Sequence, residues 1–384
     1  MKQFAYFDHA ATTPMHPLVL EKYYEVLKTN FGNSGSIHHF GRTAYGLLEE
    51  ARNTLAQMIH AKANEIVFTS GGTESDNTAI IQSAKSRQKL GKHIITTNIE
   101  HPAVMEPMKY LEEEGFEVTY LQADETGMVY LDQLIEALRE DTILVSMMYG
   151  NNEIGTLLPI KEIGTYLKKE HPEIIFHTDA VQAFGLEDIN VDEEGIDLLS
   201  ASAHKLNGPK GVGLLYIRTG VNLPSLMKGG EQELKRRAGT VNVPGIVAFQ
   251  TAAEVMLEER TAKNLANEQL RERTIEGLKN AGVKIKVNGH QTARLSHILS
   301  LQLLNVPSGR LLTLADLAGV AIATGSACTA GNPEPSHVLE AIYGKDHAAV
   351  TNTIRISFGL NNQEAEIDQL VATLTKVAND YQAD

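Results

Sequence analysis

The sequence is poor in cysteine, with Cys328 the only one among 384 residues. A single cysteine excludes an internal disulfide framework and is typical of a protein from a reducing compartment. By default a lone cysteine is a small buried hydrophobic residue, so a chemical role for Cys328 has to be argued from its neighbours.

The sequence also lacks long apolar runs and a basic leader. Its longest apolar runs, such as residues 143–149, fall far short of the roughly 20 residues that a membrane-spanning helix needs. Residues 1–13 do not show the basic segment and apolar stretch of a secretory signal. We therefore expect a cytoplasmic protein with no membrane partner.

Positive charge is scarce relative to negative charge. Lys and Arg number 34 against 48 Asp and Glu, which gives a formal net charge of −14. This balance argues against nucleic acid as a direct partner, and solubility alone accounts for it. A basic partner protein stays compatible with it.

The pattern of strands and helices predicts an α/β fold. β-rich runs alternate with amphipathic stretches of helical length, which is typical of a mostly parallel sheet covered by helices on both faces. The predicted strands are residues 65–70, 93–98, 116–121, 143–149 and 174–179, with residues 211–217 entering the sheet antiparallel. The predicted helices between them are residues 103–114, 131–139 and 160–170.

The pattern changes near Pro244, and no linker rich in Gly, Ser or Pro separates the two parts. A long helix is predicted over residues 245–281, followed by an α+β region of about 125 residues packed tightly on the first part. Its predicted strands are residues 283–287, 297–304 and 353–358, and its helices are residues 308–317, 336–343 and 363–378.

Polar clusters follow several predicted strands, where an open parallel sheet binds its ligands. The glycine-rich turn 71–77 opens a helix, which suits a phosphate, although a plain turn with Thr73 as N-cap is an alternative. His101 stands before a proline that starts a helix, and it also fits a structural or surface role. The polar loop 150–155 fits either a ligand-binding loop or an ordinary turn.

Two charged residues at successive strand ends carry the strongest signal. Asp179 ends a buried strand, where its carboxylate is costly unless a positive group such as a protonated pyridine nitrogen compensates it. Lys205 follows another β-like segment and could form a Schiff base with a cofactor aldehyde. Together with the phosphate-type turn upstream, these residues are explained economically by pyridoxal phosphate (PLP).

The second part of the chain adds two further candidates. Cys328 lies among small residues, glycines and a proline, a composition typical of a mobile loop, so its thiol could act as a nucleophile. Arg355 alternates with Ile354 and Ile356 in a predicted strand and so faces away from both. A guanidinium suits a substrate carboxylate, with a structural ion pair as the alternative.

These residues resemble the cysteine desulfurases, a branch of the class V aminotransferase-like, fold-type I PLP enzymes. The resemblance runs from Tyr6 to Arg355 and is carried by the motifs FTSGGTESDN, NNEIGT, HTDAVQAFG, SAHKLNGPKGVG, RAGTVNVPG and GSACTAGNPEPSHVL. The last motif resembles the long-loop branch associated with iron–sulfur clusters and tRNA thiolation. The resemblance implies a large domain with a mostly parallel seven-stranded sheet over residues 14–258. It also implies a small domain over residues 1–13 and 259–384, with a mobile cysteine loop at about 323–337.

The resemblance also implies roles for individual residues. Lys205 would bind PLP and shuttle protons, His101 would stack on the ring and act in acid–base steps, and Cys328 would receive the sulfur. The remaining cofactor-binding positions would be Gly72, Thr73, Asp179, Gln182, Ser202, His204 and, from the neighbouring subunit of a homodimer, Thr240. Asn152 and Arg355 would bind the substrate carboxylate, and no metal is expected.

The implied function is conversion of L-cysteine to L-alanine, with a persulfide formed on Cys328 and passed to a cluster scaffold or a tRNA-thiolating enzyme. Another PLP enzyme, such as a selenocysteine lyase or an aminotransferase, is an alternative that Lys205 and Asp179 do not exclude. A sulfur-relay scaffold without catalysis is a third, and a colourless protein without PLP would support it.

Overall fold

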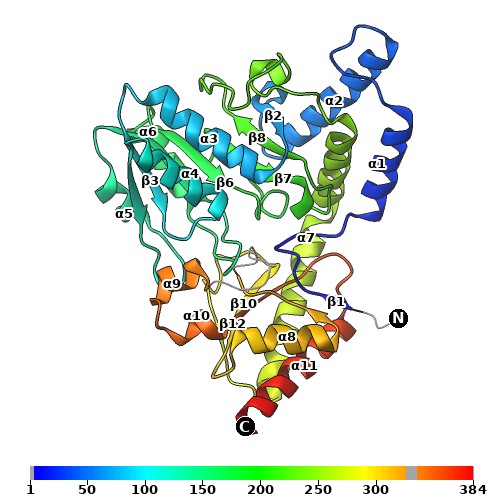
Figure 1. Cartoon of the computed structure of the whole chain (residues 1–384), viewed down its shortest axis with the longest axis vertical. Helices are drawn as coiled ribbons and strands as arrows, with labels where there is room; N and C mark the ends of the chain where they lie inside the picture. The colour runs from blue at the N-terminus through cyan, green and yellow to red at the C-terminus, as the bar shows by residue number, and fades with distance from the viewer. Residues whose placement is uncertain (1–3, 326–334, 384) are drawn as a thin grey trace.

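The computed structural model of the chain describes residues 4–325 and 335–383, and a seven-stranded sheet forms its centre (Figure 1). The strand order is β2-β8-β7-β6-β5-β3-β4. Their bounds are β2 (Ile66–Thr69), β3 (His93–Thr97), β4 (Glu117–Leu121), β5 (Thr142–Met148), β6 (Ile175–Asp179), β7 (Leu198–Ser202) and β8 (Gly213–Ile217). Only β8 runs antiparallel to its neighbours, as the sequence predicts.

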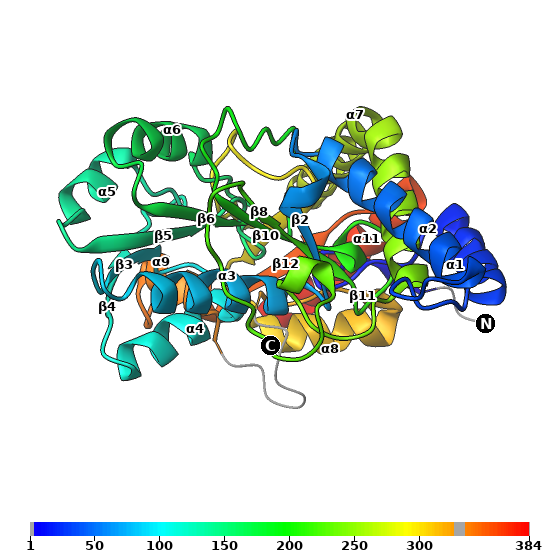
Figure 2. The ribbon, with the colours of Figure 1, turned by 90° about the horizontal axis from the view of Figure 1, so that it is seen from above.

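Helices cover both faces of this sheet (Figure 2). One face packs on α3 (Gly72–Arg87) and α4 (Pro102–Glu113), through buried side chains such as Ile80 and Met108. The other face packs on α2 (His39–Gln57), α5 (Leu131–Ala137), α6 (Ile160–Glu170) and the first half of α7 (Val243–Asn280). Because both faces are covered, the strands are buried on both sides and read as near-continuous apolar runs.

A smaller α+β part lies below the sheet in Figure 1. Its antiparallel sheet has the order β12-β10-β9, and β1 pairs with β11 beside it. The strands are β1 (Ala5–Tyr6), β9 (Ile285–Val287), β10 (Ile298–Leu303), β11 (Val320–Ala321) and β12 (Thr353–Ser357). The helices are α8 (Ser308–Ala318), α9 (His337–Tyr343), α10 (Ala348–Asn352) and α11 (Glu364–Ala383).

The helix α7 joins the two parts as one continuous element of 38 residues (Figure 1). Its first half contributes Phe249 and Ala253 to the core of the large part, and its second half contributes Leu270 and Leu278 to the core of the small part. The boundary predicted at 258/259 therefore falls inside a helix rather than in a linker.

The sequence patterns place no element before about residue 50, whereas the structure has α1 (Pro17–Thr29) and most of α2 there. Several large apolar side chains of α1 are exposed, so its pattern does not follow the single buried stripe of an ordinary surface helix. Over the described residues, no helix has both the length and the apolar character needed to cross a membrane.

Candidate active site

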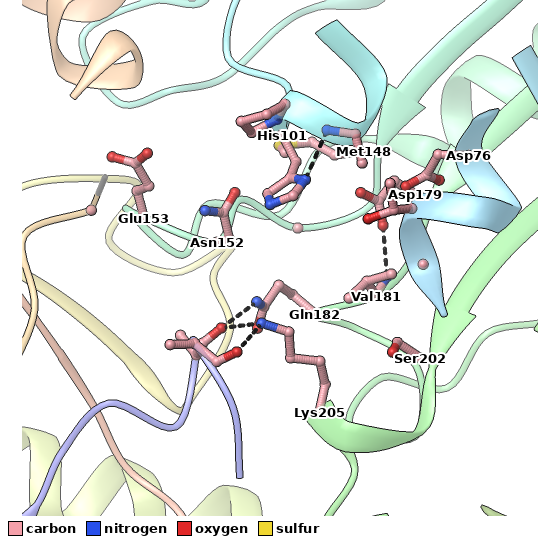
Figure 3. Close-up of a pocket in the computed structure, with 18 of the residues that line it drawn as sticks. Asp76, His101, Met148, Asn152, Glu153, Asp179, Val181, Gln182, Ser202 and Lys205 are labelled. Carbon is pink, nitrogen blue, oxygen red and sulfur yellow. Dashed lines mark hydrogen bonds between the residues drawn. The ribbon is translucent and has the colours of Figure 1, made fainter. Parts of the chain in front are cut away.

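A cavity of about 480 Å³ opens at the carboxyl ends of β3, β5, β6 and β7 (Figure 3). Connections after parallel strands converge at this edge, which places residues distant in sequence around one space. The predicted site residues that line it are Gly72, Thr73, His101, Asn152, Asp179, Gln182, Ser202, His204, Lys205 and Arg355.

Asp179 is the last residue of β6 and lies almost wholly buried at the inner wall of the cavity. One carboxylate oxygen accepts a hydrogen bond from the backbone N–H of Val181 at 2.9 Å. Burial raises the pKa of Asp179 to about 6, although the Val181 N–H and the positive charge of Lys205 oppose that rise. A cationic group in the cavity would favour the ionised form further.

Two further buried acids stand behind Asp179. Burial and the charge of Asp179 hold the pKa of Asp76 well above its usual range. Burial also raises the pKa of Glu100 to about 8, although Glu100 accepts hydrogen bonds from Thr97 at 2.7 Å and from Met148 N–H at 2.9 Å. Glu100 is therefore largely protonated at neutral pH, which limits the negative charge behind Asp179.

Lys205 reaches into the cavity from the short helical turn that follows β7 (Figure 3). Its Nζ donates to the backbone carbonyls of Ala10 and Ala11, the latter at 2.8 Å. These contacts tie the amino-terminal segment to the catalytic edge of the sheet. They also fix the amine on the same side of the cavity as Gln182.

The turn before α3 forms an open cradle with Ser202 and His204. Gly71 is the N-cap of α3 and has no side chain that could bond the first helical N–H groups. Thr73 therefore lies within the first turn of the helix, and the alternative prediction of Thr73 as N-cap is wrong. A Cβ on Gly72 would lie 2.7 Å from the Cγ2 methyl of Val181, so the Val181 side chain packs closely against the turn where glycine leaves it room. Uncapped N–H groups, two hydroxyls and a positive helix end suit a phosphate.

His101 is the N-cap of α4, and its ring faces the cavity (Figure 3). Its Nδ1 accepts a hydrogen bond from the backbone N–H of Ala103 at 3.0 Å. Burial, with the nearby charge of Lys205, lowers the pKa of His101 to about 4. The ring is thus neutral near pH 7 with its proton on Nε2, which can donate to a group in the cavity.

Arg355 comes from β12 of the small part and is buried beside Asn152. One guanidinium nitrogen donates to the Asn152 carbonyl at 3.0 Å, and another donates to Asp8 at 2.8 Å. Ile354 and Ile356 belong to the small core, so Arg355 faces the opposite way, as strand alternation predicts. The result is a buried cation at the mouth of a cavity whose inner wall is acidic.

Gln182 donates from its amide nitrogen to the Ala10 carbonyl at 2.9 Å, and its oxygen contacts His297 Nε2 at 3.3 Å. An amide NH₂ carries two protons, so one remains to donate to a cavity ligand once the Ala10 bond is made. Burial lowers the pKa of His297 to about 3, so this ring is neutral and bonds to Gln182 without adding charge.

Two predicted site residues are not among those that line the cavity in the described structure. Thr240 is exposed and lines a separate hollow with Ser70 and Arg237. Cys328 lies outside the described residues, although Gly325 and Pro335 on either side of that segment both line the cavity.

The structure also adds residues that the sequence patterns do not single out. Asp76, Glu100 and His337 lie in or behind the cavity, and the Ala10 and Ala11 carbonyls bond to Lys205. No local pattern signals them, because each acquires its place through contacts with distant segments. Only their positions beside recognised motifs hint at them.

The donor set of the cavity fits PLP. A buried carboxylate matches a protonated pyridine nitrogen, a lysine amine matches the aldehyde, and the uncapped helix end with Ser202 matches the phosphate. Behind this wall, the buried Oδ1 of Asp76 lies 3.6 Å from His177 Nε2.

Comparison with known proteins agrees with this geometry. The model of the family Aminotransferase class-V matches residues 5–370. A protein of Bacillus subtilis (strain 168) named putative cysteine desulfurase IscS 1 is 52% identical over 362 residues, which cover 94% of this chain and 95% of that one. The chain belongs to the cysteine desulfurases of the class-V aminotransferase family. It is therefore a PLP-dependent enzyme.

Other relatives support the same assignment. Cysteine desulfurase IscS of Methanosarcina thermophila is 46% identical, covering 97% of this chain and 91% of that one. A solved structure of a NifS-like protein superposes with a TM-score of 0.92 at 36% identity, covering 98% of this chain and all of that one. A structure titled SspA in complex with cysteine gives a TM-score of 0.82 at 37% identity, covering 92% of this chain and 98% of that one.

Proposed function

We propose that this desulfurase converts L-cysteine and the Cys328 thiol to L-alanine and a Cys328 persulfide. The observation that carries the proposal is the meeting of Lys205, Asp179 and Arg355 around one cavity, with Gly325 at its mouth three residues before Cys328. A cavity with a carboxylate-binding cation opposite a cofactor-binding lysine suits an amino-acid substrate. The sequence around Cys328 then distinguishes sulfur transfer from other PLP reactions.

In this proposal the inner wall holds the cofactor. Asp179 would meet the ring nitrogen, Gln182 would donate to the phenolic oxygen, and Lys205 would hold the cofactor at its aldehyde. Gly72, Thr73, Ser202 and His204 would hold the phosphate. PLP supplies the electron sink that makes the bonds at the substrate's Cα and Cβ labile.

The outer wall binds and orients the substrate. Arg355 would bind its carboxylate with the help of the Asn152 side chain, and the Asp8 contact at 2.8 Å holds the guanidinium in place. His101, neutral and protonated at Nε2, covers one side of the cavity and would exchange protons with the reacting groups. The Lys205 amine lies in the same cavity and would take up the substrate's α-proton.

Cys328 is the sulfur acceptor in this proposal. Attack of its thiolate on the substrate sulfur forms an S–S bond as the substrate's Cβ–S bond breaks, and protonation of the remaining carbon fragment completes L-alanine. The persulfide then passes to a cluster scaffold or a tRNA-thiolating enzyme. A reducing compartment is required to keep the single cysteine available, so we place the enzyme in the cytoplasm.

We further propose a homodimer whose subunits share the phosphate site. Support comes from an exposed apolar patch on α1, α2 and their connection, made of Leu18, Leu20, Tyr24, Leu27, Phe31, Ile37, Phe40 and Tyr45. A patch of this kind is typical of a protein interface. The exposed Thr240 would reach the phosphate of the partner subunit, and residues 14–258 would form the PLP-binding domain.

The experiment that tests the proposal follows alanine and sulfide from L-cysteine with a reductant, using wild type and Lys205→Ala. We expect wild type to form both products in equal amounts and Lys205→Ala to form neither. If wild type holds PLP but makes no alanine from L-cysteine, the proposal is overturned, and the substrate must be sought among other amino acids.

A further inference from the structure

Glu153 is a buried carboxylate to which the sequence and the proposed reaction give no role. It lies in the turn after β5, is 4% exposed, and lines the cavity on the side away from Lys205 (Figure 3). A carboxylate in such a place is costly unless it makes contacts that repay its burial. Its contacts are with the two ends of the segment that contains Cys328.

The carboxyl-terminal end of that segment bonds directly to Glu153. The Ser336 hydroxyl, itself buried, donates to Glu153 Oε2 and also caps α9 by accepting from Leu339 N–H at 3.1 Å. The next residue, His337, bonds through Nε2 to the Glu100 carbonyl at 2.8 Å. The start of α9 is thus attached to the large part at two points.

The amino-terminal end packs against the same carboxylate. A Cβ built on Gly325 would lie 1.9 Å from Glu153 Oε2 and 2.4 Å from its Cδ, so the Glu153 carboxylate lies directly against Gly325 and a side chain there would displace it. Two residues earlier, Ala323 pairs with Arg355 through two backbone hydrogen bonds. Gly325 is therefore held between the substrate-binding strand and Glu153.

Glu153 itself stands on a fixed turn. The side-chain oxygen of the buried Asn151 accepts from the N–H groups of Glu153 and Ile154 at 2.8 and 2.9 Å. The Asn151 amide donates in turn to the Ile99 carbonyl at 3.0 Å, beside the β3 end that supplies His101. A carboxylate on such a support can define the position of the groups it contacts.

We propose that Glu153 is a positioning residue for sulfur transfer: its carboxylate fixes Gly325 and Ser336, which flank the part of the chain that contains Cys328, relative to the cavity. The inference rests on the proposed function, since it presumes that Cys328 receives the sulfur. Cys328 follows Gly325 by three residues, and three residues span at most about 11 Å. The position of Gly325 therefore bounds where the thiol can reach, and the Glu153 contact sets that position.

The test compares Glu153→Ala, Glu153→Gln and Ser336→Ala with Glu125→Ala as control, because Glu125 is an exposed carboxylate. Loss of positioning affects the transfer step, so we expect kcat for alanine formation to fall about tenfold or more in Glu153→Ala and Ser336→Ala. KM for L-cysteine and PLP content should stay within about twofold of wild type, because Arg355 and the cofactor wall are unchanged. Glu153→Gln keeps the volume and an acceptor oxygen and should retain most of the activity.

A second readout does not depend on turnover. Because the chain has one cysteine, the rate of its alkylation by iodoacetamide reports on Cys328 alone. We expect alkylation to quicken about threefold or more in Glu153→Ala and to stay at the wild-type rate in Glu125→Ala. The double variant Glu153→Ala/Ser336→Ala should lose less kcat than the product of the two single losses, since both changes remove the Glu153–Ser336 hydrogen bond and only the loss of the α9 cap is added by Ser336→Ala.

Wild-type kcat and alkylation rate in Glu153→Ala would overturn the inference, as would a loss of kcat matched by an equal loss of PLP. Either result leaves the proposed function standing. Wild type that makes no alanine from L-cysteine would instead overturn the proposed function, and the alkylation rates would still show whether Glu153 positions the segment.

Discussion

At the scale of single residues, the cavity is lined by charged side chains that are almost fully buried. Asp179 is the clearest case, because its burial is compensated only in part by Val181 N–H and Lys205. The nearby acids Asp76 and Glu100 are held toward their neutral forms by burial. The arrangement leaves one carboxylate to meet a cationic cofactor ring.

Replacing Asp179 tests whether its carboxylate is the partner of the cofactor ring. Asp179→Asn keeps the size of the side chain but removes the charge, so the ring nitrogen loses the partner that keeps it protonated. We expect alanine formation to fall about 100-fold or more, with a shifted absorbance of the bound PLP. Asp188→Asn, at an exposed carboxylate, is the matched control. Unchanged turnover in Asp179→Asn would mean that another group pairs with the ring nitrogen.

Arg355 gives a second prediction at this scale. Arg355→Lys keeps a positive charge but loses the planar pair of donors that a carboxylate prefers. We expect KM for L-cysteine to rise about tenfold or more while PLP content is kept. Titration of cysteine against initial rate measures this, and a KM equal to that of wild type would show that the guanidinium serves the Asp8 ion pair instead.

At the scale of elements, the ends of the parallel strands bring the site together. β3 leads to His101, β5 to Asn152, β6 ends in Asp179, and β7 leads to Lys205. Glu100 lies between two of these strand ends and bonds to both, through Thr97 at the end of β3 and Met148 N–H at the end of β5. Its acceptor oxygen therefore helps to keep the two strand ends in register.

The raised pKa of Glu100 makes a prediction about stability and pH. Folding favours its protonated form, because the pKa of Glu100 is about 8 in the folded protein, whereas an unperturbed glutamate has a pKa of 4.5. Its contribution therefore falls as the pH rises from about 4.5 to about 8 and is constant outside that window.

Glu100→Gln keeps an acceptor for Thr97 and Met148 but cannot ionise. We expect the melting temperature of wild type to fall more steeply than that of Glu100→Gln between pH 5 and pH 8, measured by thermal unfolding in matched buffers. Other titrating groups are common to both proteins and cancel in the comparison. Parallel curves would mean that Glu100 ionises normally in the folded protein.

The elements of the sheet could be predicted because each strand carries its own signal. The runs at 66–69 (IVFT) and 175–179 (IFHTD) are short and open with apolar residues that favour strands, and the structure places β2 and β6 there. α1 could not be predicted in this way, because Leu20, Tyr24 and Leu27 are exposed apolar residues that blur its helical period. Exposed apolar residues of this kind fit the subunit interface that we propose.

The site could be predicted in part for a related reason. Asp179 and Lys205 stand out because charged residues rarely end buried strands. Glu153 and His337 have no such signal, because their importance arises from contacts between segments 183 and 237 residues apart. Thr240 and Cys328 stay predictions, since neither has a described contact with the cavity.

At the scale of the whole molecule, we predict that the protein forms a homodimer. The apolar patch on α1 and α2 should be buried between subunits, so light scattering should give twice the mass of one chain. Leu20→Glu/Leu27→Glu places charges in the patch and should shift the protein toward monomer. PLP should be lost more readily from that monomer, because Thr240 of the partner would no longer complete the phosphate site. A wild-type monomer that retains PLP would contradict this.

The central claim is that sulfur leaves L-cysteine by way of Cys328, and one comparison tests it most directly. Wild type and Cys328→Ala, both checked for PLP by absorbance, are given L-cysteine and a reductant, and alanine and sulfide are measured together. The account predicts equal alanine and sulfide from wild type and almost none from a Cys328→Ala protein that is still yellow. Full alanine and sulfide formation by Cys328→Ala would contradict it.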